Sequence, residues 1–153
     1  MLYSNPIDIL VSSANERDMP VIEQLAKSFD LDCEKLSWKQ FVAAKKNDTI
    51  IGFGRLREYP GCTEVSTVGV VLEERNKGVG TAIVKELIRM GHSEIFVTCV
   101  IPDFFRRFGF FAVQHYPSVL QKKVDFCKLY GFNDERIFVM KHLKAGNGDA
   151  GSR

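Results

Sequence analysis

The sequence predicts a single α/β (α+β) domain in which strands and helices are mixed along the chain. Three observations support this prediction. Runs rich in β-branched residues recur, apolar residues at helical spacing lie between them, and one strand leads through a glycine-rich loop directly into a helix. We expect residues 1–143 to form the domain and the tail 144–153, which has no apolar anchor, to be disordered.

The first predicted elements are a strand over residues 6–13 and an amphipathic helix within residues 15–29. The apolar side chains of this helix recur at helical spacing, at Met19, Ile22, Leu25, Ala26 and Phe29. Asp18 is placed to cap the helix, and Pro20 fits its first turn, where the missing N–H is harmless. A second short helix is expected within residues 33–41.

A hairpin follows, with strands at residues 41–46 and 49–59 joined by Asn47 and Asp48. Gly52 and Gly54 weaken the second strand but permit close approach of another backbone or a bulge. Residues 62–72 form a longer strand, rich in β-branched residues.

The second half of the chain starts with a helix that begins at Gly78. Its apolar face carries Val79, Ile83 and Leu87, and Gly91 stands where a C-terminal cap glycine belongs. The remaining predicted elements are strands at 94–101, 110–115 and 135–143 and helices at 102–109 and 118–130.

Composition excludes several classes of protein. Apolar residues make up 45% and charged residues 26% of the 153, which are ordinary globular values. The net charge of +2 is small and scattered, so no nucleic-acid partner is expected. No apolar run is long enough to span a membrane, and the start lacks the features of a secretory signal, so the expected location is cytoplasmic. The four cysteines lack metal-ligand spacing, so we expect reduced thiols and no metal.

The stretch "ERNKGVGTAIV", residues 74–84, is the strongest functional signal. A strand, a tight glycine loop and a helix direct backbone N–H groups and a partial positive charge at one point, which is an arrangement that binds phosphate. Arg75 and Lys77 add formal charge, and Gly78 and Gly80 let the backbone approach an anion.

Two other phosphate motifs fit this stretch poorly. A dinucleotide fingerprint requires a third glycine where Ile83 stands, and a P-loop requires Gly-Lys followed by Ser or Thr. A surface turn without a ligand remains the alternative.

The chain resembles the GNAT superfamily of acyl-coenzyme A-dependent N-acetyltransferases. The resemblance rests on residues 75–80, which are similar to the family's R/Q-x-x-G-x-G/A loop, and on "DFFRRFGF", similar to its aromatic-x-x-x-Gly-Phe segment. It covers roughly the first 115 residues. It implies a mixed central sheet of about six to seven strands flanked by helices, with parallel strands 64–72 and 94–101 splayed apart, and acetyl-CoA as co-substrate.

The resemblance also implies which residues contact the cofactor. The loop amides would bind the pyrophosphate of coenzyme A, and the strand before the loop would offer main-chain groups to the pantetheine arm. The implied cofactor-binding residues are Val68, Gly69, Val70, Arg75, Asn76, Lys77, Gly78, Val79, Gly80, Thr81 and Phe105.

Catalysis requires a proton acceptor. An amine with a pKa of about 10.4 is mostly protonated at pH 7, and freeing its lone pair costs about 4.6 kcal/mol. Glu64 matches in spacing the strand glutamate that is the general base in the histone-acetylating branch, and apolar neighbours would raise the pKa of its carboxyl. The alternative is a strand-end carboxylate that faces solvent.

Phe105 departs from the family pattern, because many members carry there a tyrosine that protonates the leaving thiolate. Phenylalanine cannot donate a proton. The acid is then water, another group such as Tyr116, Tyr130 or Cys99, or none at all.

A weaker similarity to the branch that acetylates free amino acids points to a small-molecule amine or amino acid as substrate. Arg55 or Arg57 would bind the substrate carboxylate, or both are exposed strand residues. A protein- or peptide-acetylating enzyme and a non-catalytic acyl-CoA sensor remain alternatives, and a homodimer remains open as the assembly.

Overall fold

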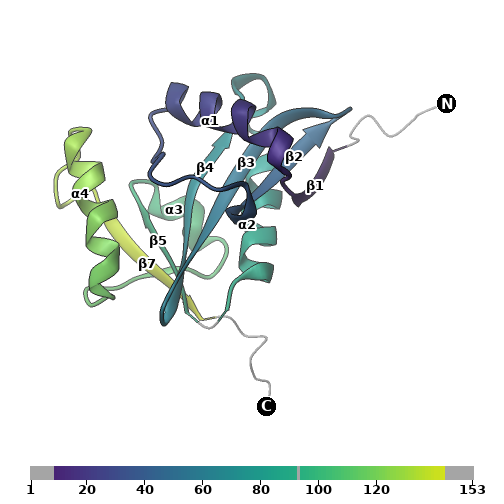
Figure 1. The fold of residues 1–153 in the computed structure, drawn as a ribbon. Helices are drawn as coiled ribbons and strands as arrows, with labels where there is room; N and C mark the ends of the chain where they lie inside the picture. Colours follow the sequence, from purple (N-terminus) through teal and green to yellow (C-terminus); the bar gives the residue numbers. More distant parts are fainter. Residues whose placement is uncertain (1–8, 93, 144–153) are drawn as a thin grey trace, which may run out of the picture. The chain divides into compact units, whose positions relative to one another are not determined.

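The computed structural model describes residues 9–92 and 94–143, and Figure 1 follows the chain through them. They divide into two compact units. Unit 1 consists of the described residues of Met1–Arg55 together with Thr67–Arg89, and unit 2 consists of Leu56–Ser66 together with the described residues of Met90–Arg153.

The strands form one open, mixed sheet of seven strands in the order β1-β2-β3-β4-β5-β7-β6. The β4–β5 pair is parallel, and β1–β2, β2–β3, β5–β7 and β6–β7 are antiparallel. The strands are β1 (Ile9–Ser13), β2 (Phe41–Lys46), β3 (Thr49–Tyr59), β4 (Cys62–Val70), β5 (Glu94–Cys99), β6 (Phe111–Ala112) and β7 (Phe138–Leu143). The helices are α1 (Met19–Ser28), α2 (Val79–Met90), α3 (Pro102–Arg106) and α4 (Gln121–Leu129), with short 3-10 turns η1 (Glu16–Asp18), η2 (Trp38–Gln40), η3 (Leu72–Glu74) and η4 (Ser118–Leu120).

The hairpin of β2 and β3 forms where the sequence predicts it. Asn47 and Asp48 both have positive φ, 51° and 67°, which suits the tight turns that join antiparallel strands. Pairing runs from Phe41 opposite Arg55 to Lys46 opposite Thr49. The local turn residues therefore favour this hairpin.

In unit 1 an aromatic and aliphatic cluster joins α1 to the sheet. Ile22 and Ala26 of α1 are fully buried with Phe41 of β2 and Phe53 of β3. The ring of Phe53 lies 6.4 Å from that of Phe29 and 6.3 Å from that of Phe41. These contacts place the apolar stripe predicted for residues 15–29 in the core.

Helix α2 packs on the face of β3 opposite to α1, and two glycines of β3 allow this contact. A Cβ on Gly54 would lie 2.6 Å from Ile83 and 2.8 Å from Leu87, and one on Gly52 would lie 2.9 Å from Ile83. Such distances are closer than carbon atoms pack. The glycines therefore let α2 lie directly on the strand, as the close approach expected of them implied.

Arg55 is fully buried and joins β3 to the chain between α1 and β2. Its Nε donates to Oε1 of Gln40 at 2.8 Å, and Nη2 donates to the carbonyls of Glu34 at 2.7 Å and Lys35 at 2.8 Å. The expectation that Arg55 is exposed is wrong, because these acceptors balance the cost of burying its charge.

Unit 2 has its own core, in which α4 covers β5 and β7 (Figure 1). The cluster consists of Cys62, Phe96, Leu120, Val124 and Val139. The ring of Phe105 on α3 lies 5.6 Å from that of Phe110, which in turn lies 5.2 Å from the ring of His142. Phe105 is therefore a core residue of this unit.

The thiols are free, as expected. Cys99 is buried on β5, where its Sγ lies 3.7 Å from Sδ of Met140, and burial raises the pKa of this thiol to about 11. Burial also raises the pKa of Cys33, whose side chain is only half-buried.

Five local expectations need correction or restriction. Gly91 does not adopt the left-handed conformation of a cap, and is needed because a Cβ there would lie 2.6 Å from Ile95. Asp18 caps the turn before the helix instead, since its Oδ2 accepts from the amide of Asn15 at 2.9 Å. The short helix expected at 33–41 is the single turn η2, and the strand at 110–115 is the two-residue β6. The tail lies outside the described residues, so its disorder remains a prediction.

Arg55→Met should lower the free energy of unfolding by about 2–4 kcal/mol, because it leaves the carbonyls of Glu34 and Lys35 and the amide oxygen of Gln40 without their charged donor. Arg57→Met is the matched control on the same strand. The guanidinium of Arg57 packs over the ring of Tyr59 at 5.3 Å, so its loss should cost less than about 1 kcal/mol. Urea unfolding of both variants measures the difference, and equal effects would contradict the role given to Arg55.

Cys99 should be alkylated far more slowly than Cys33 at pH 8. A thiol with a pKa of about 11 is thiolate in only about one molecule in a thousand at that pH. Below its pKa the thiolate fraction rises tenfold per pH unit, so labelling should accelerate about 100-fold between pH 8 and 10. Timed iodoacetamide labelling with mass spectrometry measures both rates, with urea-unfolded protein as the control in which they converge. Equal rates in the folded protein would contradict the shift.

Candidate active site

The glycine loop links β4 to α2 within unit 1. After β4 the amide of Val71 bonds the carbonyl of Ile51 at 2.9 Å, and the turn η3 leads to Arg75. Asn76 and Gly78 have positive φ, 64° and 90°. A backbone that turns left-handed twice within three residues curls its amides inward, which is a geometry that binds anions.

Gly78 occupies the N-cap position of α2. Its carbonyl accepts the first helical hydrogen bond, from the amide of Ala82 at 3.0 Å. The amides of Val79 and Gly80 precede this bond and point out of the first turn. Because glycine has no side chain, it cannot cap them as Ser or Asp would. The helix end thus presents main-chain donors next to exposed residues 75–78.

Arg75 braces the loop rather than extending from it. Its Nε donates to the carbonyl of Val70 at 2.8 Å, and its guanidinium lies 5.1 Å from the centre of the Phe29 ring. These two contacts tie the loop to the end of β4 and the end of α1. They also leave the positive charge of Arg75 beside residues 68–70.

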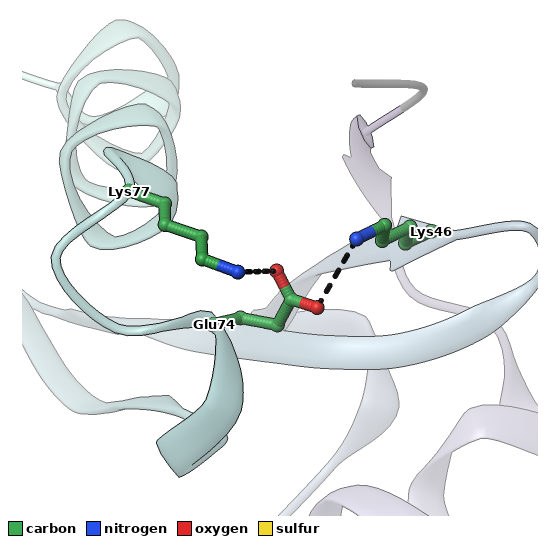
Figure 2. Close-up of polar contacts among 3 residues, drawn as sticks. All are labelled: Lys46, Glu74 and Lys77. Carbon is green, nitrogen blue, oxygen red and sulfur yellow. Dashed lines mark hydrogen bonds and ion pairs between the residues drawn. The ribbon is translucent and has the colours of Figure 1, made fainter. Parts of the chain in front are cut away.

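A carboxylate holds two lysines at the loop. Figure 2 shows Lys77 and Lys46 reaching opposite oxygens of Glu74, with Nζ to Oε distances of 3.6 Å and 3.3 Å. Glu74 is the most buried of the three, with 14% of its side chain exposed. The charges of Lys46, Glu74 and Lys77 sum to +1. Together with Arg75 they give these residues a net positive charge, which favours binding of an anion.

The parallel strands β4 and β5 pair over a short stretch only. Thr63, Glu64 and Val65 lie opposite Ile95, Phe96 and Val97, whereas β4 continues to Val70. Thr67 has a φ of 50°, which is rare for a β-branched residue, and its Oγ1 donates to the carbonyl of Asp32 at 2.8 Å. The parallel pairing therefore ends at Val65 opposite Val97, and the splay expected of strands 64–72 and 94–101 stays a prediction.

Glu64 lies in unit 2 and is buried, with 2% of its surface exposed, so the solvent-facing alternative is excluded. Its Oε1 accepts a hydrogen bond from the hydroxyl of Tyr59 at 3.2 Å. Cys62 and Phe96 share its face of the sheet by strand alternation and register. Burial raises the pKa of the Cys62 thiol, and the nearby Glu64 raises it further.

The three suggested proton donors differ in setting. The hydroxyl of Tyr116 donates to Oε1 of Gln121 at 3.0 Å, and Tyr130 is 50% exposed beside Phe126. Cys99 holds its proton up to a pKa of about 11, which makes it a poor donor.

The structure thus groups the candidate residues by unit. Unit 1 brings together residues 68–70 and the loop, and unit 2 holds Glu64 and Phe105. Sequence reasoning missed Tyr59. The signal for it was present, because Tyr59 and Glu64 flank the Pro60 and Gly61 turn and cross-strand neighbours near a turn touch.

Metal ligands and membrane spans are both missing from the described part of the chain. Within 9–92 and 94–143, no cluster of three or more His, Cys, Asp or Glu side chains is arranged to hold a metal ion. In the same ranges, no helix combines the length and apolar character needed to cross a membrane.

Solved structures show the same fold at low sequence identity. Rv2747 from Mycobacterium tuberculosis, crystallised with CoA, has a TM-score of 0.69 and 21% identity over 88% of this chain and 98% of that chain. N-acetylglutamate synthase from Neisseria gonorrhoeae, complexed with coenzyme A and N-acetyl-glutamate, has a TM-score of 0.73 and 14% identity over 93% of this chain but only 36% of its own. Arabidopsis thaliana Naa50, bound to the bisubstrate analogue CoA-Ac-MVNAL, has a TM-score of 0.58 and 17% identity, over 88% of this chain and 98% of its own.

Sequence comparisons give a family but no individual relative. No curated protein matches the chain. The family model described as Acetyltransferase (GNAT) family matches residues 9–110, which is more than half of the chain and includes β4, the glycine loop and α3. The chain therefore belongs to the acetyltransferase (GNAT) family.

Proposed function

We propose that this protein transfers an acetyl group from acetyl-CoA to a primary amine, by direct attack of the amine within a ternary complex. The observation that carries the proposal is the start of α2, where main-chain donors follow two left-handed turns in a positively charged loop. The family assignment and the CoA complexes of Rv2747 and the gonococcal synthase support it.

In this proposal the amides of residues 76–81 bind the diphosphate of CoA. A dianionic group gains most from several amide donors and the positive end of a helix dipole. Lys77 adds charge beside them, and the half-buried Val68 and Val70 offer main-chain groups to the pantetheine arm. Gly69 contributes space, because a Cβ there would lie 2.8 Å from the ring of Phe53. Phe105 would act through packing only.

The chemical step needs one proton acceptor and one leaving group. The amine nitrogen attacks the thioester carbonyl carbon, the C–S bond breaks, and CoA leaves as thiolate. The amine starts protonated, so Glu64 first takes one proton and frees the lone pair, directly or through a water molecule, and the nitrogen gives its second proton to water when the amide forms. Phe105 and Cys99 are unsuitable as acids, and the hydroxyl of Tyr116 already donates to Gln121. The proposal therefore assigns the acid role to neither Tyr116 nor Tyr130, and the thiolate takes its proton from water. An ordinary thiol pKa of about 8.5 makes this step easy.

The acceptor that we propose is a small molecule such as an amino acid. Its support is the fold shared with N-acetylglutamate synthase. Arg55 is fully buried, and its Nε and Nη2 donate to the segment before β2, so of the two arginines considered for a substrate carboxylate we retain Arg57.

Acetylation of peptides is the second candidate function, because Naa50 was solved with a peptide-based bisubstrate analogue. Release of CoA thiol against a panel of free amino acids and a panel of peptides discriminates the two. Binding of acetyl-CoA without thiol release from any amine would instead indicate a sensor.

Gly78→Ala should weaken CoA binding at least tenfold, because an L-residue is strained at a φ of 90° and the loop amides would shift. Gly61→Ala is the matched control. Gly61 also has a φ of 90°, and a Cβ there would have no atom within 4 Å, but it lies in the β3–β4 turn. Both variants should lose similar stability, and only the first should lose affinity in calorimetric titrations. Equal affinities of the two variants for CoA would show that the loop does not bind CoA.

Glu64→Gln should lower kcat by about 100-fold or more near pH 7 and remove the acidic limb of the pH profile, because the variant lacks the proton acceptor. CoA affinity should not change. Glu58→Gln, which alters an exposed carboxylate on β3, is the control and should retain activity. A Glu64 variant with the full activity and pH profile of the unmodified protein would refute the assignment.

A further inference from the structure

The burial of Glu64 raises a question about proton transfer. A base that works in every turnover must release the proton that it takes up, yet only 2% of Glu64 is exposed. The hydroxyl of Tyr59 lies 3.2 Å from its Oε1, and Tyr59 is half-buried rather than buried. Tyr59 thus links the buried carboxyl to a residue that is partly exposed.

We propose that Tyr59 is a positioning residue for Glu64, which orients the carboxylate through this hydrogen bond and relays its proton to water. The proposal rests on the function proposed for Glu64. It assigns a role to a hydroxyl that the family motifs quoted above do not include.

The geometry suits both parts of this role. Tyr59 is the last residue of β3, and its ring packs against the unit 2 cluster that contains Cys62 and Phe96. The guanidinium of Arg57 lies 5.3 Å from the centre of the same ring, on one of its sides. A ring held by packing and by a cation keeps its hydroxyl in one place, so the hydrogen bond to Glu64 is preorganised.

The relay conserves protons at each residue. The amine gives one proton to the carboxylate of Glu64. The protonated carboxyl then passes a proton to the oxygen of Tyr59 while the hydroxyl of Tyr59 gives its own to water. Both residues return to their starting states, and no tyrosinate accumulates. The protonated amine loses two protons in total: one replaces the proton that water gives to the CoA thiolate, and the other is released to water, so the reaction needs no other reagent.

Charged and titratable groups surround the pair on every neighbouring element, and the relay must work among them. Nζ of Lys141 lies 2.9 Å from Oε2 of Glu94 and 6.0 Å from the centre of the Phe96 ring. Phe96 pairs with Glu64 on one side and with Lys141 on the other, so the three residues lie side by side across the sheet. Strand alternation and register put Arg57 on β3, Cys62 on β4, Glu94 on β5 and Lys141 on β7 on the same face as the pair. Tyr116 packs on the same cluster, and Lys123 is buried on α4, where its Nζ lies 5.7 Å from the centre of the Phe126 ring. The test below changes none of these groups except the hydroxyl of Tyr116, which the control variant removes. Their electrostatic effect on Glu64 is therefore the same in the unmodified protein and in Tyr59→Phe.

Tyr59→Phe tests the proposal, because it removes only the hydroxyl. We expect kcat to fall about tenfold and the acidic limb of kcat/KM to move upward by about one pH unit, since a carboxylate that loses a donated hydrogen bond binds a proton more readily. Tyr116→Phe is the matched control. Its ring packs on the same cluster, but its hydroxyl donates to Gln121, so its pH profile should stay unchanged.

The outcomes separate this inference from the proposed function. If Glu64→Gln loses activity while Tyr59→Phe keeps the kcat and pH profile of the unmodified protein, the relay is wrong and the base assignment stands. If Glu64→Gln is fully active, the proposed function fails first. In the double variant, Tyr59→Phe should add no further loss to Glu64→Gln. If the two losses of activity multiply in the double variant, Tyr59 does not act through Glu64. If Tyr59→Phe and Tyr116→Phe lose equal activity, both hydroxyls affect activity only through packing, and the relay is wrong.

Discussion

The contact between α2 and the two glycines of β3 is the constraint on which unit 1 depends. Ile83 and Leu87 occupy the space that side chains at positions 52 and 54 would fill, so the helix axis lies close to the strand. This packing fixes where α2 can begin, and the short turn η3 and Arg75 must connect β4 to that point. The connection uses two residues with left-handed backbone conformation, Asn76 and Gly78. The amides that follow them point out of the N-terminal end of α2.

The two units carry different parts of the proposed chemistry. Unit 1 offers main-chain donors and a positive balance, which suit recognition of a diphosphate whatever acyl group or amine accompanies it. Unit 2 offers a buried carboxylate with a hydroxyl partner, which suits proton transfer. Phe105, where many members of the family have a tyrosine acid, is absorbed into the core beside Phe110 and leaves the thiolate to water.

Much of the fold could be predicted from the sequence, because its signals are local. Asn47 and Asp48 specify their turn through their own backbone preferences, and the α1 stripe follows from helical spacing. Arg55, Gly91 and Tyr59 were misjudged or missed because their roles depend on partners distant in the chain or across a turn. The carbonyls that accept hydrogen bonds from Arg55 belong to Lys35 and Glu34, 20 and 21 residues away in the chain. No sequence pattern around Arg55 indicates them. Gly91 was interpreted as a cap, whereas the packing of Ile95 requires it.

The central claim is that the main-chain donors at the start of α2 bind the diphosphate of CoA. Amide NMR of the labelled protein, titrated with CoA and separately with pantetheine, which lacks the diphosphate, tests it most directly. CoA should move the amide resonances of residues 76–81 more than any others, and pantetheine should leave them in place. Unchanged loop resonances at saturating CoA, or equal shifts with both compounds, would contradict it.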